Sequence, residues 1–318
     1  MDRTVRLWDV SAGTLLSILS RHGSAIADIV FSSDGLHLAL AGGDAKVRLW
    51  DFNSDWSSVE LQDHISNIIS VGYSPDGHSV FSVGTDRTVR QWEPLTTALG
   101  SKVLELPKSI ALWTAAMSPD GNQIAAGSVD GATRIWSLRD GIPGPVLEGH
   151  PCVVKHLVYS PCGLCIATTS TDRVVRLRDL HIHCFVLEES TETSEESTKA
   201  SEKFAKASLV PRISFSPIGL QLAIGYPNGT VGIYDPRSID LLDSRMLIHE
   251  SIYTLTYSPN GRQLAVGGWE VIYLWDLQSE KPEIRLCGHK SDITNTAYDP
   301  SGEWIASCSW NPVVFLWK

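Results

Sequence analysis

The chain has 318 residues, of which 43% are hydrophobic and 19% are charged, a balance typical of a globular rather than a disordered protein. Its net charge of -10 argues against binding along a nucleic-acid backbone, which requires a basic surface. No apolar run approaches the ~20 residues of a membrane-spanning helix, and the N-terminal residues lack an apolar signal core. We therefore expect a cytoplasmic or nuclear protein with no nucleic-acid and no membrane partner.

The first predicted elements are two short strands, residues 4–8 and 14–19, and the first of them ends in the pair Trp8-Asp9. Similar segments recur along the chain, each ending in an aromatic residue or a replacement for one. These positions are Trp8, Trp50, Trp92, Trp136, Arg178, Tyr234, Trp275 and Trp317, at intervals of 42, 42, 44, 42, 56, 41 and 42 residues. A repeat of this length is typical of proteins in which each unit packs against its neighbours.

Two further features keep the same register. Seven apolar segments, each followed by a turn with Gly at its end, precede the later aromatic positions by 18 or 19 residues. The segments lead into Phe31, Tyr73, Met117, Tyr159, Phe215, Tyr257 and Tyr298. A histidine also stands 28 residues before four of the terminal positions, at His22, His64, His150 and His289. Turns of this kind between short apolar runs predict β-hairpins.

Together these features resemble the WD40 repeat family over essentially the whole chain. The resemblance implies an all-β fold, a seven-bladed propeller with four antiparallel strands per blade, forming one domain over residues 1–318. It also implies that the N- and C-terminal strands close the ring, with residues 14–19 pairing beside residues 313–317. One of the two strands 4–8 and 313–317 is then left over, either because it is displaced or because the chain is part of a longer repeat array; we favour the array.

The resemblance further implies a structural role for the histidines. In this family a His before the first strand, a Ser or Thr on the second, an Asp in the following turn and a Trp on the third form a hydrogen-bonded chain. The matching set is complete at His64, Ser82, Asp86 and Trp92. The set at His289, Ser307, Asn311 and Trp317 has Asn in place of Asp. We interpret both sets as structural rather than catalytic or metal-binding.

The sequence carries no motif that favours an enzyme or a cofactor. It lacks a Gly-rich phosphate loop, a zinc-protease motif and a nucleophile elbow. Cys162 and Cys165 could form half of a zinc site with His181 and His183, but a predicted strand separates the halves by about 10 Å, so we expect no metal. The polar residues Asp28, His156 and Arg212 occupy one row of the inner strands, and we interpret this row as a hydrated channel wall rather than a catalytic centre.

The segment 188–203 is rich in Glu, Ser and Thr and accounts for the single 56-residue interval. We expect it to be an acidic loop inserted after the fourth blade, because few of its residues could contribute to a core.

The resemblance implies that partners bind the face formed by the turns that precede the inner strands and those that follow the second strands. The candidate partner-binding residues on this face are Asn67, Trp113, Lys155, Tyr253, Trp269, Asp292 and Trp310. The tryptophans among them lie outside the repeated strand-end positions, so they are either binding anchors or plugs of the channel.

We therefore predict a monomeric, non-catalytic scaffold or adaptor without a cofactor, binding a protein or peptide partner. Two alternatives remain: the ligand-sensing repeat region of a larger fungal or bacterial signalling NTPase and, more remotely, a propeller enzyme.

Overall fold

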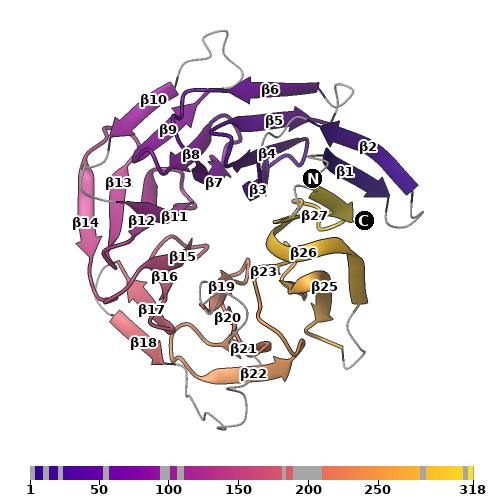
Figure 1. The fold of residues 1–318 in the computed structure, drawn as a ribbon. Coiled ribbons are helices and arrows are strands. Elements are labelled where there is room, and N and C mark those ends of the chain that lie inside the picture. The colour runs from indigo at the N-terminus through magenta and orange to yellow at the C-terminus, as the bar shows by residue number, and fades with distance from the viewer. Residues whose placement is uncertain are drawn as a thin grey trace, which may run out of the picture.

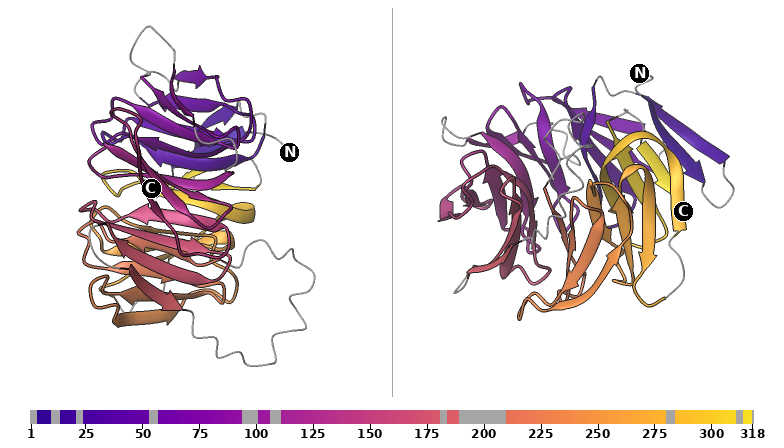
Figure 2. Two further views of the ribbon diagram at one scale, coloured as in Figure 1. Left: turned by 90° about the vertical axis from the view of Figure 1, so that its left-hand side faces the viewer. Right: turned by 60° about the horizontal axis from the view of Figure 1, so that its bottom comes forward.

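The computed structural model describes residues 4–9, 14–20, 24–52, 57–93, 101–105, 111–180, 184–188, 210–279, 284–310 and 314–317. Within these ranges every regular element is a β-strand. The strands wind in chain order around a central axis, as Figure 1 shows, and from the edge they form a thick disc (Figure 2). The fold is the predicted all-β propeller.

Five sheets each contain four consecutive antiparallel strands. Their strands are β3 (Ile26–Phe31), β4 (His37–Gly42), β5 (Val47–Asp51) and β6 (Ser57–Leu61); β7 (Ile68–Tyr73), β8 (Val80–Gly84), β9 (Thr88–Trp92) and β10 (Ser101–Glu105); β11 (Leu112–Met117), β12 (Gln123–Ser128), β13 (Thr133–Ser137) and β14 (Pro143–Leu147); β15 (Val154–Tyr159), β16 (Cys165–Ser170), β17 (Val174–Asp179) and β18 (Cys184–Glu188); β19 (Arg212–Phe215), β20 (Leu222–Gly225), β21 (Thr230–Tyr234) and β22 (Leu241–Met246).

The sixth sheet has six strands because one long strand serves two blades. Its strands are β23 (Thr254–Tyr257), β24 (Gln263–Gly267), β25 (Trp269–Asp276), β26 (Ile284–Tyr298), β27 (Ile305–Ser309) and β28 (Val314–Trp317). The first part of β26 pairs with β25 as an outer strand, and its second part pairs with β27 as an inner strand. The hydrogen bonds therefore define six complete four-stranded blades and a seventh unit made of the end of β26, β27 and β28.

The inner strands close a ring without a gap. Each contacts the next in the order β3, β7, β11, β15, β19, β23 and β26, and β26 in turn contacts β3. A hydrophobic cluster holds this closure, in which Ala306 and Cys308 of β27 pack with Ile29, Leu38 and Trp50 of the first blade. Seven inner strands thus surround the axis, as the seven apolar segments in the sequence predict.

The predicted pairing of residues 14–19 beside residues 313–317 is wrong. Strand β1 (Thr4–Asp9) lies against β28, and β2 (Thr14–Ser20) pairs with β1 in a separate two-stranded sheet. The physical reason is local: the two strands are joined by a short connection, and they form an antiparallel hairpin along their full lengths. With β2 paired to β1, it is β1 that contacts β28, although the two strands belong to different sheets.

The second strand of each blade is the most deeply buried, because neighbouring blades cover both of its faces. Leu38 and Leu40 of β4 have no exposed surface, and neither do Ala39 and Ala41, whose side chains point to the opposite face. The outer strand β14 is instead mostly exposed. The hydrophobic clusters thus lie between neighbouring blades, as in the cluster that joins β27 to the first blade.

Candidate functional site

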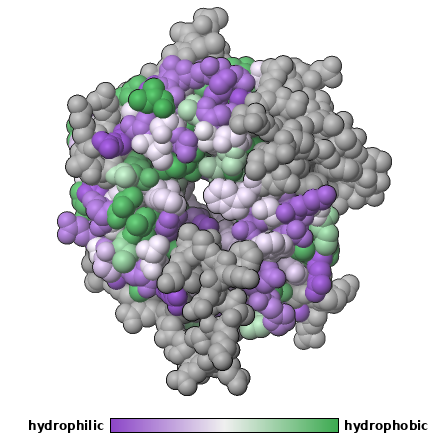
Figure 3. All heavy atoms as spheres, in the orientation of Figure 1, coloured by the Kyte–Doolittle hydropathy of each residue, from purple (hydrophilic) through white to green (hydrophobic). Residues whose placement is uncertain are grey.

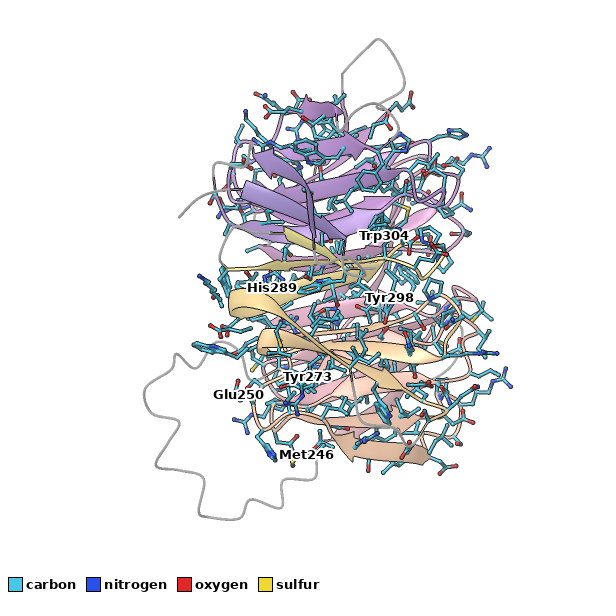
Figure 4. The ribbon with its side chains drawn as sticks, turned by 90° about the vertical axis from the view of Figure 1, so that its right-hand side faces the viewer. Met246, Glu250, Tyr273, His289, Tyr298 and Trp304 are labelled. Carbon is cyan, nitrogen blue, oxygen red and sulfur yellow. The ribbon has the colours of Figure 1, made fainter. Side chains whose placement is uncertain are left out.

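The two faces of the ring carry different connections. Figure 4 views the ring from the edge, with Glu250 and His289, which precede inner strands, near one face and Trp304, which follows the turn after an inner strand, toward the other. We call the first of these the turn face. Figure 3 shows this face, where polar and apolar residues alternate around a central hollow.

Three tryptophans of the turn face are about half exposed or more exposed than that. The exposed fractions are 49% for Trp113 at the start of β11, 45% for Trp269 at the start of β25 and 62% for Trp310 just after β27. The strand-end tryptophans Trp92 and Trp317 are buried. The exposed indoles therefore contribute little to the core, and large aromatic side chains on a rigid surface are typical anchors for a partner.

Trp269, Trp310 and Tyr253 all lie next to Asp292. Asp292 pairs with Trp269 in the β25–β26 ladder, and its carbonyl oxygen accepts a hydrogen bond of 3.2 Å from the backbone of Trp310. The Tyr253 phenol donates to the Asp292 carboxylate, whose pKa is nevertheless raised because burial outweighs this bond. Four of the predicted partner-binding residues thus come together between the sixth and seventh blades.

Lys155 and Trp113 form a second group. The Lys155 ammonium lies 2.9 Å from the centroid of the Trp113 ring, a cation–π contact between the fourth and third blades. Burial, and then the neighbouring Arg212, lower the pKa of Lys155 to about 8. Neither this contact nor the lowered pKa of Lys155 could be derived from the sequence, where Trp113 and Lys155 are 42 positions apart.

Asn67 is exposed and stands apart from both groups, just before β7 in the second blade. Its carbonyl oxygen accepts hydrogen bonds of 2.8 Å from the backbone of Thr85 and 3.1 Å from its hydroxyl. Sequence reasoning missed the neighbouring Ile65, which is 87% exposed on the same blade. Its position directly after His64 was the available signal, since that histidine marks the turn face.

The complete histidine set forms a hydrogen-bonded chain through the second blade. His64 Nδ1 lies 2.7 Å from Asp86 Oδ2, His64 Nε2 lies 2.7 Å from Ser82 Oγ, and Trp92 Nε1 donates to Ser82 Oγ at 2.8 Å. A carboxylate can only accept, so Nδ1 carries the proton and Nε2 accepts from the serine. Burial lowers the pKa of His64, although Asp86 opposes this shift, and the imidazole is neutral at pH 7.

The second set has the same inner part. His289 Nε2 lies 2.7 Å from Ser307 Oγ, and Trp317 Nε1 donates to the same oxygen at 2.8 Å. Burial lowers the pKa of His289 to about 3. Asn311 lies outside the residues that the structure describes. In the first blade Leu40 stands where these sets have serine, and the buried Trp50 Nε1 consequently has no hydrogen-bond partner.

The inner polar row links neighbouring blades. Asp28 accepts hydrogen bonds from Ser70 Oγ at 2.9 Å, from the Val71 backbone at 2.9 Å and from Asn295 Nδ2 at 2.5 Å, joining the second and seventh blades to the first. Burial raises the pKa of Asp28, although these bonds oppose the shift. On the fourth blade, burial and Arg212 lower the pKa of His156 to about 3.

The described residues contain no group of three or more His, Cys, Asp or Glu side chains placed to hold a metal ion. Cys162 lies 3.3 Å from the Ser160 hydroxyl, whereas His181 and His183 fall outside the described ranges. The segment 188–203 is also outside them, apart from Glu188 at the end of β18.

In the part of the chain that the structure covers, we find no helix with the length and apolar character needed to cross a bilayer.

The closed ring of blades defines a β-propeller. A family model described as "WD domain, G-beta repeat" matches residues 13–51, 57–93, 101–137, 141–179, 244–276 and 280–318. The chain therefore belongs to the WD40 repeat family. The matched segments leave out most of the fifth blade, β19–β22, whose four strands the structure nevertheless forms.

The chain is similar to several curated proteins. It is 26% identical over 217 residues to the periodic tryptophan protein 2 homolog of Dictyostelium discoideum, covering 66% of this chain and 22% of that protein. It is 24% identical over 197 residues to the apoptotic protease-activating factor 1 of Danio rerio, covering 58% and 14%. It is 26% identical over 207 residues to THO complex subunit 3 of Arabidopsis thaliana, covering 64% and 61%. The chain thus spans between about one seventh and three fifths of the length of these relatives.

Proposed function

We propose that this protein is a non-catalytic interaction platform that binds a protein or peptide partner through its turn face. The observation that carries the proposal is the exposure of Trp113, Trp269 and Trp310 on one side of a rigid ring. Exposed indoles cost solvation free energy in the isolated protein and recover it when a partner covers them. The relative named as a subunit of the THO complex supports a role in an assembly.

The polar groups on the inner strands favour binding over catalysis. Hydrogen bonds that join three blades engage the Asp28 carboxylate, so it is not available as a base. The low pKa of His156, about 3, keeps its imidazole neutral at pH 7 and makes it a weak base. We accordingly propose no enzyme activity and no cofactor.

We further propose that the protein acts as a monomer in the cytoplasm or the nucleus. Contacts between β26 and β3 close the ring within one chain, so a second copy is not needed to complete the fold.

The test is a comparison of turn-face variants in binding and in unfolding. Proteins captured by the wild type are identified by mass spectrometry, and their affinities are then measured by calorimetry. Trp113→Ala and Trp310→Ala should each weaken binding by about 2 kcal/mol or more, yet cost only about 1 kcal/mol in the free energy of unfolding. Trp92→Ala removes a buried indole, so its unfolding cost should be about 3–5 kcal/mol.

The matched control is Ile218→Ala. Ile218 is 73% exposed in the turn between β19 and β20, on the opposite face, so its loss should leave partner affinity unchanged. If Trp113→Ala and Trp310→Ala bind normally, the partner uses another surface. If they unfold as easily as Trp92→Ala, the two tryptophans are plugs of the ring rather than anchors.

The second candidate function is the ligand-sensing repeat region of a larger signalling NTPase. The similarity to apoptotic protease-activating factor 1, which spans only 14% of that protein, supports it. Sequencing the transcript upstream of Met1 tests this candidate. An in-frame P-loop would favour it, and a stop codon in frame directly before Met1 would exclude it.

A further inference from the structure

Three nitrogen-bearing side chains come from two inner strands that contact each other, β15 and β19. Lys155 and His156 lie on β15, and Arg212 begins β19 in the next blade. Arg212 is close enough to affect the titration of both β15 residues, although burial is the larger influence on each. Burial also lowers the pKa of the Arg212 guanidinium to about 10, and at pH 7 both Arg212 and Lys155 remain charged.

This basic group, Lys155, His156 and Arg212, has no anionic partner among the residues that the structure describes. Arg212 Nε and His156 Nδ1 are both enclosed, and neither forms a hydrogen bond. The described contact of Lys155 is with the ring of Trp113. The Asp292 carboxylate accepts from the Tyr253 phenol, and no ion pair joins it to Arg212 among the described residues.

Other enclosed arginines of the same protein are paired. The buried Arg48 binds Asp44 at 2.6 Å and Glu60 at 3.0 Å. Arg176 binds Asp172 at 3.0 Å in the same blade as Lys155. Arg48 and Arg176 thus each have a carboxylate partner, whereas Arg212 has none among the described residues and its Nε is buried without a hydrogen bond.

An enclosed cation without a counter-ion destabilises the folded protein, because it loses hydration and gains no ion pair. An anion that enters the site supplies the ion pair that the cation lacks. The planar guanidinium of Arg212 can donate two parallel hydrogen bonds to one oxyanion, the Lys155 ammonium adds a second positive charge, and a neutral imidazole can donate one more N–H. Residues that destabilise a fold in this way are typical of binding sites.

We propose that Lys155, His156 and Arg212 form a binding site for an oxyanion, a carboxylate or a phosphate, carried by the partner that binds the turn face. The anion site stands on the geometry of the basic group, and only the identity of its carrier rests on the proposed function. The adjoining Trp113 places the site beside an aromatic anchor, so a partner can insert an acidic or phosphorylated side chain while it covers the indole.

The test titrates the purified chain with sodium phosphate and, separately, sodium acetate at pH 7 and constant ionic strength, followed by calorimetry. We expect saturable binding to the wild type and binding weaker by about tenfold or more in Arg212→Met. The matched control is Arg262→Met, which removes an exposed arginine from a turn on the opposite face and should bind like the wild type. Tighter binding of phosphate than of acetate indicates a phosphorylated source, and the reverse order indicates a carboxylate.

Thermal unfolding separates a binding role from a structural one. In chloride buffer, Arg212→Met should unfold at a higher temperature than the wild type, because the unpaired charge is gone. Phosphate should raise the Tm of the wild type but not that of the variant. Should Arg212→Met prove too unstable to study, Arg212 stabilises the fold and the proposal fails. Lys155→Gln gives an independent measurement, with weaker anion binding expected and equal binding contradicting the site.

Two outcomes keep this inference distinct from the proposed function. Absence of saturable anion binding to the folded wild type overturns the anion site and leaves the turn-face proposal untouched. Normal anion binding together with normal partner affinity in Trp113→Ala and Trp310→Ala overturns the turn-face proposal and leaves the site standing. A partner that binds Arg212→Met as tightly as the wild type shows that its oxyanion does not occupy the site.

Discussion

Replacing His64 by alanine tests the hydrogen-bonded chain of the second blade. The imidazole is buried and bridges Ser82 Oγ and Asp86 Oδ2, each at 2.7 Å. His64→Ala removes both hydrogen bonds and leaves a space that the neighbouring strands can fill only in part. Trp92 Nε1 still donates to Ser82, but the serine hydroxyl loses the acceptor for its own proton.

The magnitude follows from what each partner retains. The His64 ring is neutral because burial lowers its pKa, so its removal costs hydrogen bonds rather than a full ion pair. Asp86 Oδ2 keeps a hydrogen bond of 3.1 Å from the backbone of Ile65, which limits the loss on that side. The Ser82 proton is left buried without an acceptor. We expect the free energy of unfolding to fall by about 1–3 kcal/mol.

The assay is urea unfolding followed by circular dichroism, with His78→Ala as the control. His78 is exposed in the turn between β7 and β8 of the same blade, so its loss should change stability by less than about 0.5 kcal/mol. In the double variant His64→Ala/Ser82→Ala the unpaired hydroxyl is gone as well, and the combined loss should be smaller than the sum of the single losses by about 0.5 kcal/mol or more. Equal losses at His64 and His78, or strictly additive losses, would refute the reasoning.

Three further predictions concern pH and ring closure. His289 has a pKa of about 3 when folded and an ordinary value of 6.5 when unfolded, so below pH 6.5 the unfolded chain binds the extra proton and stability falls. Between pH 7 and pH 5, His289 should lower the free energy of unfolding of the wild type by about 2 kcal/mol. The free energy of unfolding of His289→Asn, measured by urea unfolding, should fall less over the same interval. An equal fall in both proteins contradicts the low pKa of His289. Asp28→Ala should lower the free energy of unfolding by about 1–3 kcal/mol, because it leaves Ser70 and Asn295 without their shared acceptor, whereas a neutral effect would show that water replaces it. Deleting residues 1–20 should lower the Tm measured by calorimetry, and deleting only 1–9 should lower it too, because β1 is the strand beside β28; an unchanged Tm after the shorter deletion would favour β2 instead.

The sequence by itself determined the strand order within each blade. Every repeat carries its own turn and its own strand-end residue, and antiparallel neighbours joined by short turns pair locally. The hydrogen-bonded chain from His64 to Trp92 spans only 28 residues, and its spacing is therefore visible in the sequence. The same register placed Trp113 and Trp310 near the turns, but it left open whether they are exposed anchors or plugs of the channel; the structure shows them exposed.

Only the tertiary structure decided how distant parts of the ring meet. Residues 4–8 and 313–317 carry the same local strand pattern, so nothing in either segment shows which of the N-terminal strands lies beside β28. Asp28 and Asn295 are 267 positions apart and come within 2.5 Å because the last inner strand packs against the first. The approach of Arg212 to Lys155 and His156 likewise depends on how the fifth blade packs against the fourth. Hydrogen bonds within a blade are set by neighbouring residues in the chain, whereas contacts between blades are set by the curvature at which the whole ring closes.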